Sequence, residues 1–83
     1  MKHFVYLLIT HHKKKLISYV GYTTNIKKRL KLHNSSKGAK FTKGKKWKLA
    51  YSKHYKTKSI AMSEEIKLKK NYKLRKKIKK NFN

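Results

Sequence analysis

The sequence lacks cysteine and proline altogether, and it has only three glycines and two acidic residues, Glu64 and Glu65. Without cysteine, disulfide bonds and thiolate-ligated zinc sites are excluded. The apolar run over residues 4–9 is shorter than a signal-peptide core and far shorter than a membrane span. These absences exclude a disulfide-stabilised or membrane-spanning protein, and a cytoplasmic location is the simplest expectation.

What the chain has instead is positive charge. Lysine and arginine total 26 residues, so the formal net charge is +24 at pH 7. Such a surface favours a polyanion, because each neutralised phosphate releases condensed counterions. We expect nucleic acid as the partner rather than an anionic membrane surface, with DNA favoured over RNA. AT-rich coding explains part of the lysine count, but it does not explain the missing acids.

The 83 residues suit one compact domain. High charge raises disorder as an alternative, but ten aromatic residues and clear periodic segments favour a folded chain. The pattern predicts strands over 4–9 and 16–21, a helix from a Thr24 or Asn25 cap to about His33, a strand over 47–55 and a helix over 59–70. Residues 34–46 are expected to form a flexible basic loop. We divide the chain into a domain over 1–70 and a basic helix or arm over 71–83.

The first two strands are expected to form an antiparallel hairpin. If its loop is symmetric about residues 12 and 13, Tyr6 lies opposite Tyr19 and the phenols share one face of the sheet. This register depends on a turn that has no glycine or asparagine to define its type. A slip of one residue would separate the two rings.

Each predicted helix carries a stripe at helical spacing. The first stripe contains Ile26, Arg29, Leu30 and His33, and the second contains Ala61, Glu65, Leu68 and Tyr72. Arg29 is unusual because almost every other cation is lysine, and a guanidinium binds two phosphate oxygens at once. Packing is the alternative role for Arg29. Glu65 is expected either to hold one Mg²⁺ (or Mn²⁺), whose other ligands are water and phosphate, or to form a salt bridge.

Three further side chains are candidates for chemistry. Tyr6 and Tyr19 are either aromatic core or phenols whose ionisation is favoured by the surrounding positive charge, and Tyr22 is another phenol nearby. His33 either supports a phenol or phosphate or is merely structural. The remaining histidines lack the spacing of a metal site. The lysines expected to contact nucleic acid are Lys37, Lys40, Lys43, Lys45 and Lys46.

The order of these segments resembles the GIY-YIG nuclease superfamily, in its small single-domain bacterial branch. The segments that carry the resemblance are Phe4-Val5-Tyr6, Tyr19-Val20-Gly21, residues 25–30, His33-Asn34, residues 37–42, Leu49-Ala50-Tyr51 and residues 61–69. In the last segment the family spacing selects Glu65, the same residue that helical periodicity selects. The sequence departs from the family pattern in having Phe4 at the first glycine, Tyr22 after the second triplet and no proline before the third strand.

The resemblance implies an α+β fold, a small three-stranded antiparallel sheet flanked by helices in the order β-β-α-β-α-α. It also implies metal-dependent phosphodiester hydrolysis by an endonuclease of low sequence specificity. In that interpretation Tyr19 helps to activate water beside Tyr6, Arg29 steadies charge on the phosphate, His33 supports them, and Glu65 binds the one divalent ion. The alternative is a non-catalytic nucleic-acid-binding protein on the same scaffold.

Overall fold

The computed structural model describes residues 1–82. This part of the chain forms three strands, β1 (His3–His12), β2 (Lys15–Thr23) and β3 (Lys48–Tyr55). It also forms three α-helices, α1 (Ile26–Asn34), α2 (Lys58–Lys70) and α3 (Tyr72–Asn81), and a 3₁₀ turn, η1 (Lys40–Thr42). The fold is therefore α+β, as predicted, and residues 72–81 adopt the helical alternative.

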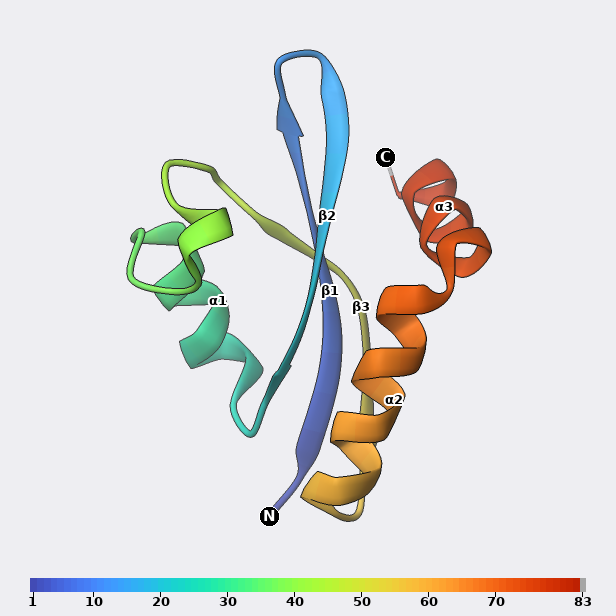
Figure 1. Ribbon diagram of the computed structural model, residues 1–83. Coiled ribbons are helices and arrows are strands. Elements are labelled where there is room, and N and C mark those ends of the chain that lie inside the picture. The colour runs from blue at the N-terminus through green and yellow to red at the C-terminus, as the bar shows by residue number, and fades with distance from the viewer. Residues whose placement is uncertain (83) are drawn as a thin grey trace.

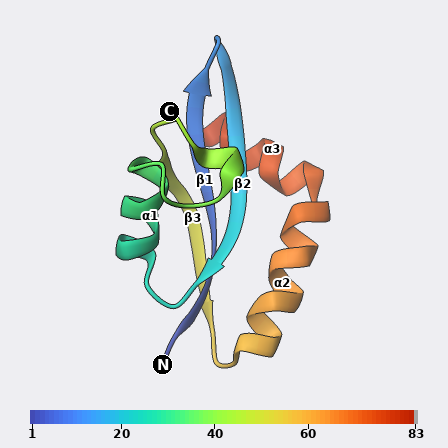
Figure 2. The same ribbon diagram turned by 60° about the vertical axis from the view of Figure 1, so that its left-hand side comes forward.

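The strands form one antiparallel sheet in the order β2-β1-β3. The apolar run in the first strand predicts a strand covered on both faces, and β1 is the central strand, with residues 5–9 all buried. Helix α1 and η1 cover one face, while α2 and α3 cover the other (Figures 1 and 2). Within residues 1–82, no helix is long and apolar enough to cross a membrane.

The hairpin register differs from the prediction by two residues. Tyr6 lies opposite Gly21, and Tyr19 lies opposite Leu8. The turn is centred on Lys13 and Lys14, whose φ angles of 51° and 65° give the left-handed geometry that a two-residue hairpin turn needs. Lysine is an uncommon residue for this geometry, so the sequence did not indicate the turn. Because side chains alternate with a period of two, the shift still leaves both phenols on one face.

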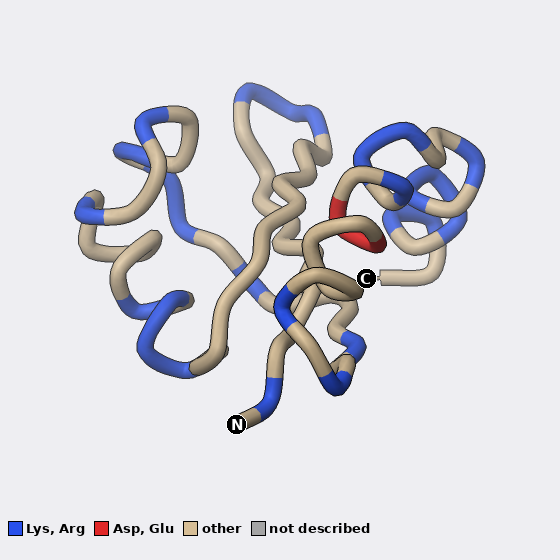
Figure 3. The backbone as a smooth tube through the Cα atoms, turned by 60° about the horizontal axis from the view of Figure 1, so that its bottom comes forward, with Lys and Arg blue, Asp and Glu red and all other residues tan. Residues whose placement is uncertain are grey.

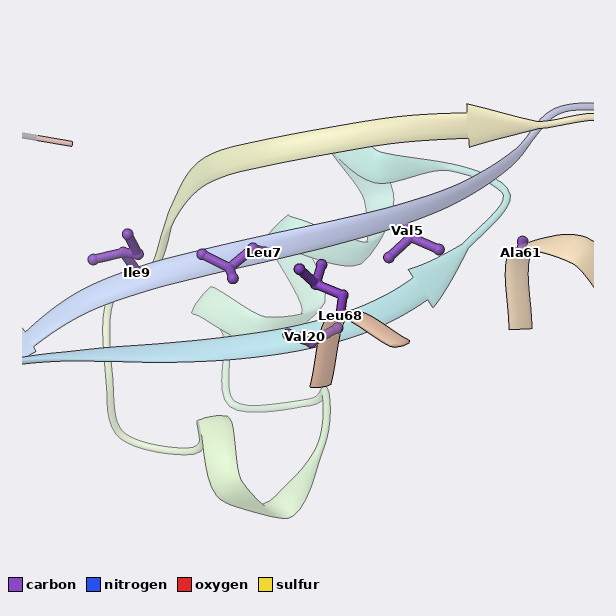
Figure 4. Close-up of a cluster of buried hydrophobic side chains, with 6 residues drawn as sticks. All are labelled: Val5, Leu7, Ile9, Val20, Ala61 and Leu68. Carbon is purple, nitrogen blue, oxygen red and sulfur yellow. The ribbon is translucent and has the colours of Figure 1, made fainter. Parts of the chain in front are cut away.

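An aliphatic core fills the space between the sheet and α2. Its buried members are Val5, Leu7, Ile9, Val20, Ala61 and Leu68 (Figure 4). Leu74, Ile78 and Phe82, in and just after α3, pack against the same cluster. The predicted α2 stripe is confirmed at Ala61 and Leu68 but wrong at Tyr72, which is 61% exposed because α2 ends before it.

The opposite face of the sheet has a smaller, aromatic core. Tyr6, Leu8 and Trp47 are buried there, and Ile17, Tyr19 and Leu30 pack against them. The segment between α1 and β3, predicted to be a flexible basic loop, contains η1 and lies over this face. The Asn34 side chain bonds both backbone polar groups of Trp47. Its Oδ1 accepts from the Trp47 N–H, and its Nδ2 donates to the Trp47 carbonyl at 3.1 Å. The indole N–H donates to the Thr42 carbonyl at 3.1 Å.

Candidate active site

Helix α1 brings His33, Leu30 and Arg29 to the aromatic face of the sheet. The helix begins where the Asn25 side chain accepts a hydrogen bond from the Lys28 backbone N–H at 3.1 Å, as the cap prediction requires. From that start, the predicted stripe faces inward. His33 is completely buried, and Arg29 is partly buried.

His33 connects the central strand to the loop through both of its ring nitrogens. The Tyr6 hydroxyl lies 2.8 Å from Nε2, and the Thr42 hydroxyl lies 2.9 Å from Nδ1. Since the Thr42 hydroxyl donates to the Ala39 carbonyl at 2.7 Å, it accepts from an Nδ1–H of His33. Nε2 is then the acceptor of the Tyr6 O–H. One neutral tautomer of His33 satisfies the whole chain of hydrogen bonds.

Two glycines leave the space that this arrangement needs. A β-carbon on Gly21 would lie within 2.4 Å of the Tyr6 ring carbon Cζ and even closer to its hydroxyl oxygen. A β-carbon on Gly38 would clash with His33 Nδ1 at a similarly short distance. The glycine of the second triplet therefore allows the Tyr6 phenol to lie directly against β2.

The environment keeps both partners of the Tyr6–His33 pair neutral. Burial raises the pKa of Tyr6 above its ordinary value, and the Arg29 side chain opposes this rise through hydrogen bonding and through its charge without cancelling it. Burial also lowers the pKa of His33, and the Arg29 charge lowers it further. The expectation that positive charge favours a phenolate therefore does not hold at Tyr6, because desolvation is the larger effect.

Arg29 has an unusual hydrogen-bonding state. Its Nε is buried, and no acceptor within residues 1–82 forms a hydrogen bond with it. A buried donor without a partner is costly, about 1–3 kcal/mol, and is rare in folded proteins. The guanidinium is thus held beside Tyr6 and His33, and one of its donors is buried without an acceptor.

Tyr19 lies on the same face as Tyr6 but is more accessible. Its ring meets His33 edge-on at 5.2 Å between centroids and stacks on Phe41 at 6.2 Å. Phe41 is 52% exposed, whereas Trp47 is buried in the core beneath. The structure therefore brings Tyr6, Tyr19, Arg29 and His33 together, as the sequence predicts, and Tyr19 is the more accessible of the two phenols.

Glu65 lies on α2, with a side chain that is 12% exposed. Its carboxylate is 3.7 Å from the Lys69 ammonium, and its charge contributes to the raised pKa of Tyr6. Among residues 1–82, no three acidic, histidine or cysteine side chains cluster as a metal site. A single carboxylate still suits Mg²⁺, which commonly keeps several waters and binds substrate phosphates as well. Glu65 lies on the helix that covers the opposite face of the sheet from α1, and the salt bridge that was its alternative role is present. An ion held by this one carboxylate would take its other ligands from water and phosphate.

The predicted lysine cluster surrounds this face. Lys37, Lys40, Lys43 and Lys46 are exposed in the segment that carries η1, and the Lys45 ammonium lies 5.2 Å from the centre of the Phe41 ring. Both acids of the chain lie side by side on α2 (Figure 3). Sequence reasoning did not assign a role to Thr42 or Asn34, and the available signal was two small polar residues within the basic segment that precedes Trp47.

The fold and these side chains define a small α+β domain with a phenol, imidazole and guanidinium site on one face of a three-stranded sheet. The family model described as the GIY-YIG catalytic domain matches residues 2–79, and the chain belongs to this family.

Several UPF0213 proteins are similar to this chain. A UPF0213 protein of Oceanobacillus iheyensis is 39% identical over 69 residues, which cover 82% of this chain and 77% of the relative. A UPF0213 protein of Bacillus licheniformis is 51% identical over 53 residues, which cover 63% of this chain and 55% of the relative. The solution NMR structure of a UPF0213 protein from Bacillus halodurans is 32% identical with a TM-score of 0.51, covering all of this chain and 88% of that one.

Proposed function

We propose that this protein hydrolyses phosphodiester bonds in nucleic acid as a divalent-metal-dependent endonuclease of low sequence specificity, acting on DNA in preference to RNA. The observation that carries the proposal is the buried, unpartnered Arg29 Nε beside the Tyr6–His33 pair. Arg29 as a whole is only partly buried, and the two salt bridges within residues 1–82 leave it without an acid, so a phosphodiester of the substrate can serve as its counter-ion. The family to which the chain belongs supports the same class of reaction.

Arg29 binds the phosphate that is attacked. Its guanidinium is held near the neutral Tyr6 and His33, so its charge is directed to the substrate rather than neutralised by an internal acid. As the reaction proceeds, negative charge increases on the phosphate oxygens. A fixed guanidinium stabilises that charge without reorganisation.

Tyr6 and His33 form a path for the proton of the attacking water. The Tyr6 hydroxyl already donates to His33 Nε2, so its oxygen can accept a proton while its own proton passes to Nε2. His33 is neutral near pH 7 because its pKa is lowered, which leaves it able to receive that proton. Thr42 keeps Nδ1 as the donor and so keeps Nε2 directed at Tyr6.

Tyr19 and Glu65 complete the site in this proposal. Tyr19, the more accessible phenol, orients the water at the phosphate. Glu65 would hold one Mg²⁺ or Mn²⁺, and a bound divalent ion supplies Lewis-acid stabilisation of the phosphate and the leaving oxygen. The exposed lysines around η1 hold the nucleic-acid backbone by contacts that carry no sequence information.

Nicking of supercoiled plasmid DNA in the presence of Mg²⁺ or Mn²⁺ tests the proposal. Glu65→Gln and Tyr19→Phe are expected to lower the nicking rate by at least about a hundredfold, the usual scale for removing one group that stabilises a transition state. Glu64→Gln is the matched control, because Glu64 is the neighbouring acid and pairs with Lys67 at 3.0 Å on the helix surface.

Equal nicking by all four proteins would indicate a contaminating nuclease. Tight, salt-sensitive binding of DNA without nicking in either metal would instead support the non-catalytic nucleic-acid-binding protein.

A further inference from the structure

The second arginine of the chain has no part in the function proposed above. Arg75 lies on α3, and its Nε–H donates to the Leu68 carbonyl at 3.2 Å. Its Nη2 donates to the Lys69 carbonyl at 3.0 Å. These carbonyls belong to the last turn of α2, and that of Leu68 also accepts the Asn71 backbone N–H at 3.2 Å. The two bonds fix the plane of the guanidinium and leave its Nη1 amino group available to an outside acceptor.

The fixed guanidinium lines a cavity of about 170 Å³. The other lining residues are Ser18, Tyr19 and Val20 of β2 and Lys69 of α2. The lining therefore combines two cations, a serine and Tyr19 at the edge strand of the sheet, and it includes no acid. Such a lining suits a small anion with several oxygen acceptors.

Capping of α2 alone does not explain the choice of residue at position 75. A lysine can donate to the last carbonyls of a helix, and 24 of the 26 lysine and arginine residues in this chain are lysine. Arginine differs in offering donors on several edges of one rigid plane. It can bind the carbonyls of α2 on one edge and an anion on another at the same time.

We propose that this cavity binds a second phosphodiester of the substrate strand, next to the one held by Arg29, with Arg75 and Lys69 as its ligands. The inference rests on the proposed nucleic-acid substrate. Because Tyr19 lines the cavity and also belongs to the candidate active site, a strand bound at both places crosses the edge of β2 at Tyr19. Arg75 then acts as a binding residue that fixes the path of the strand.

Binding of a phosphate at Lys69 would also affect Glu65, its ion-pair partner. In the free protein its ammonium is 3.7 Å from the Glu65 carboxylate. A phosphate in the cavity attracts the same ammonium, so binding of the strand weakens the Glu65–Lys69 ion pair and frees the carboxylate.

Binding of a fluorescein-labelled oligodeoxynucleotide in EDTA tests the inference without requiring cleavage. We expect Arg75→Gln to lower the slope of log K against log salt by about 0.7–0.9, the value for one lost phosphate contact. The matched control is Lys73→Gln, which removes one charge from the exposed side of the same helix and is expected to change the slope by less than half as much. Equal slopes for the two variants would overturn the inference.

A second variant guards against an effect on folding. Ser18→Asp places a carboxylate in the cavity and leaves the bonds between Arg75 and α2 intact, so it is expected to weaken binding at least as much as Arg75→Gln. In NMR spectra of the wild-type protein, the Arg75 Nε–H and the Ser18 and Val20 amide signals should shift on addition of the oligonucleotide. Unchanged signals at saturation would also overturn the inference.

The outcomes separate the two proposals. Altered binding in Arg75→Gln without plasmid nicking by the wild-type protein supports the second phosphate contact and removes the nuclease proposal. Nicking with unaltered binding in Arg75→Gln does the reverse. No binding of nucleic acid by the wild-type protein removes both.

Discussion

Gly21→Ala tests the close approach of Tyr6 to β2, on which the candidate active site depends. A β-carbon there would lie 2.4 Å from Tyr6 Cζ, so the ring must move. Because Tyr6 is 2% exposed, this movement disturbs packing at a cost of about 1–3 kcal/mol. It also breaks the hydrogen bond to His33 and leaves buried polar atoms unsatisfied, at a further cost of about 1–3 kcal/mol. We expect the free energy of unfolding to fall by about 2–6 kcal/mol in total.

The expected loss is large for a chain of this length. At about 0.05–0.15 kcal/mol per residue, the whole domain has about 4–12 kcal/mol of stability. Urea unfolding followed by circular dichroism measures the change, with an unchanged m-value as the check on two-state behaviour. Ser18→Ala on the same strand is the control and is expected to change the free energy of unfolding by less than about 0.5 kcal/mol.

A double-mutant cycle with Tyr6→Phe isolates the shared hydrogen bond. Each single variant breaks the bond between Tyr6 and His33, so the double variant loses it only once. The combined loss of stability should therefore be smaller than the sum of the single losses by about 0.5–3 kcal/mol. A loss below about 1 kcal/mol in Gly21→Ala, or additive losses in the cycle, would refute the role assigned to this glycine.

Three further predictions concern the site. Because the pKa of His33 is lowered in the folded chain, the unfolded chain binds a proton near pH 6.5 that the folded chain does not, so the free energy of unfolding should fall as pH drops below about 6.5. His33→Gln should flatten that dependence in urea unfolding, and an unchanged slope would contradict the neutral imidazole. Thr42→Val should lower the free energy of unfolding by about 1–3 kcal/mol, while Thr42→Ser, which keeps the hydroxyl, should lose much less. Lys69→Gln should tighten Mn²⁺ binding about two- to fivefold in titration calorimetry by releasing Glu65, whereas Lys67→Gln, which frees only the neighbouring acid, should not.

The sequence predicted the elements well because their signals are local. The apolar run of β1, the Asn25 cap and the stripes of α1 and α2 each depend on residues a few positions apart. The same periodicity placed Arg29 and His33 on the inner face of α1. Observed ends differ from the predicted ones by up to three residues, mainly because the hairpin strands extend through polar residues that have no hydrophobic pattern.

The contacts that build the site join residues far apart in the sequence, so these local signals did not predict them. The register required knowing that Lys13 and Lys14 adopt positive φ, and nothing in their side chains favours it. The anchored loop depends on a hydrogen bond between His33 and Thr42, which periodicity does not encode. The direction of the pKa shift at Tyr6 depends on burial, which outweighs the charge that the composition emphasises.

The isolation of the two acids on α2 also affects the order in which the protein would bind nucleic acid and a divalent ion. A free divalent cation approaching a chain with a net charge of +24 is repelled by nearly the whole surface, and the carboxylate available to it already has an ammonium partner. A bound polyanion reverses that repulsion and brings its own condensed cations. We therefore expect the metal to arrive with the nucleic acid rather than before it.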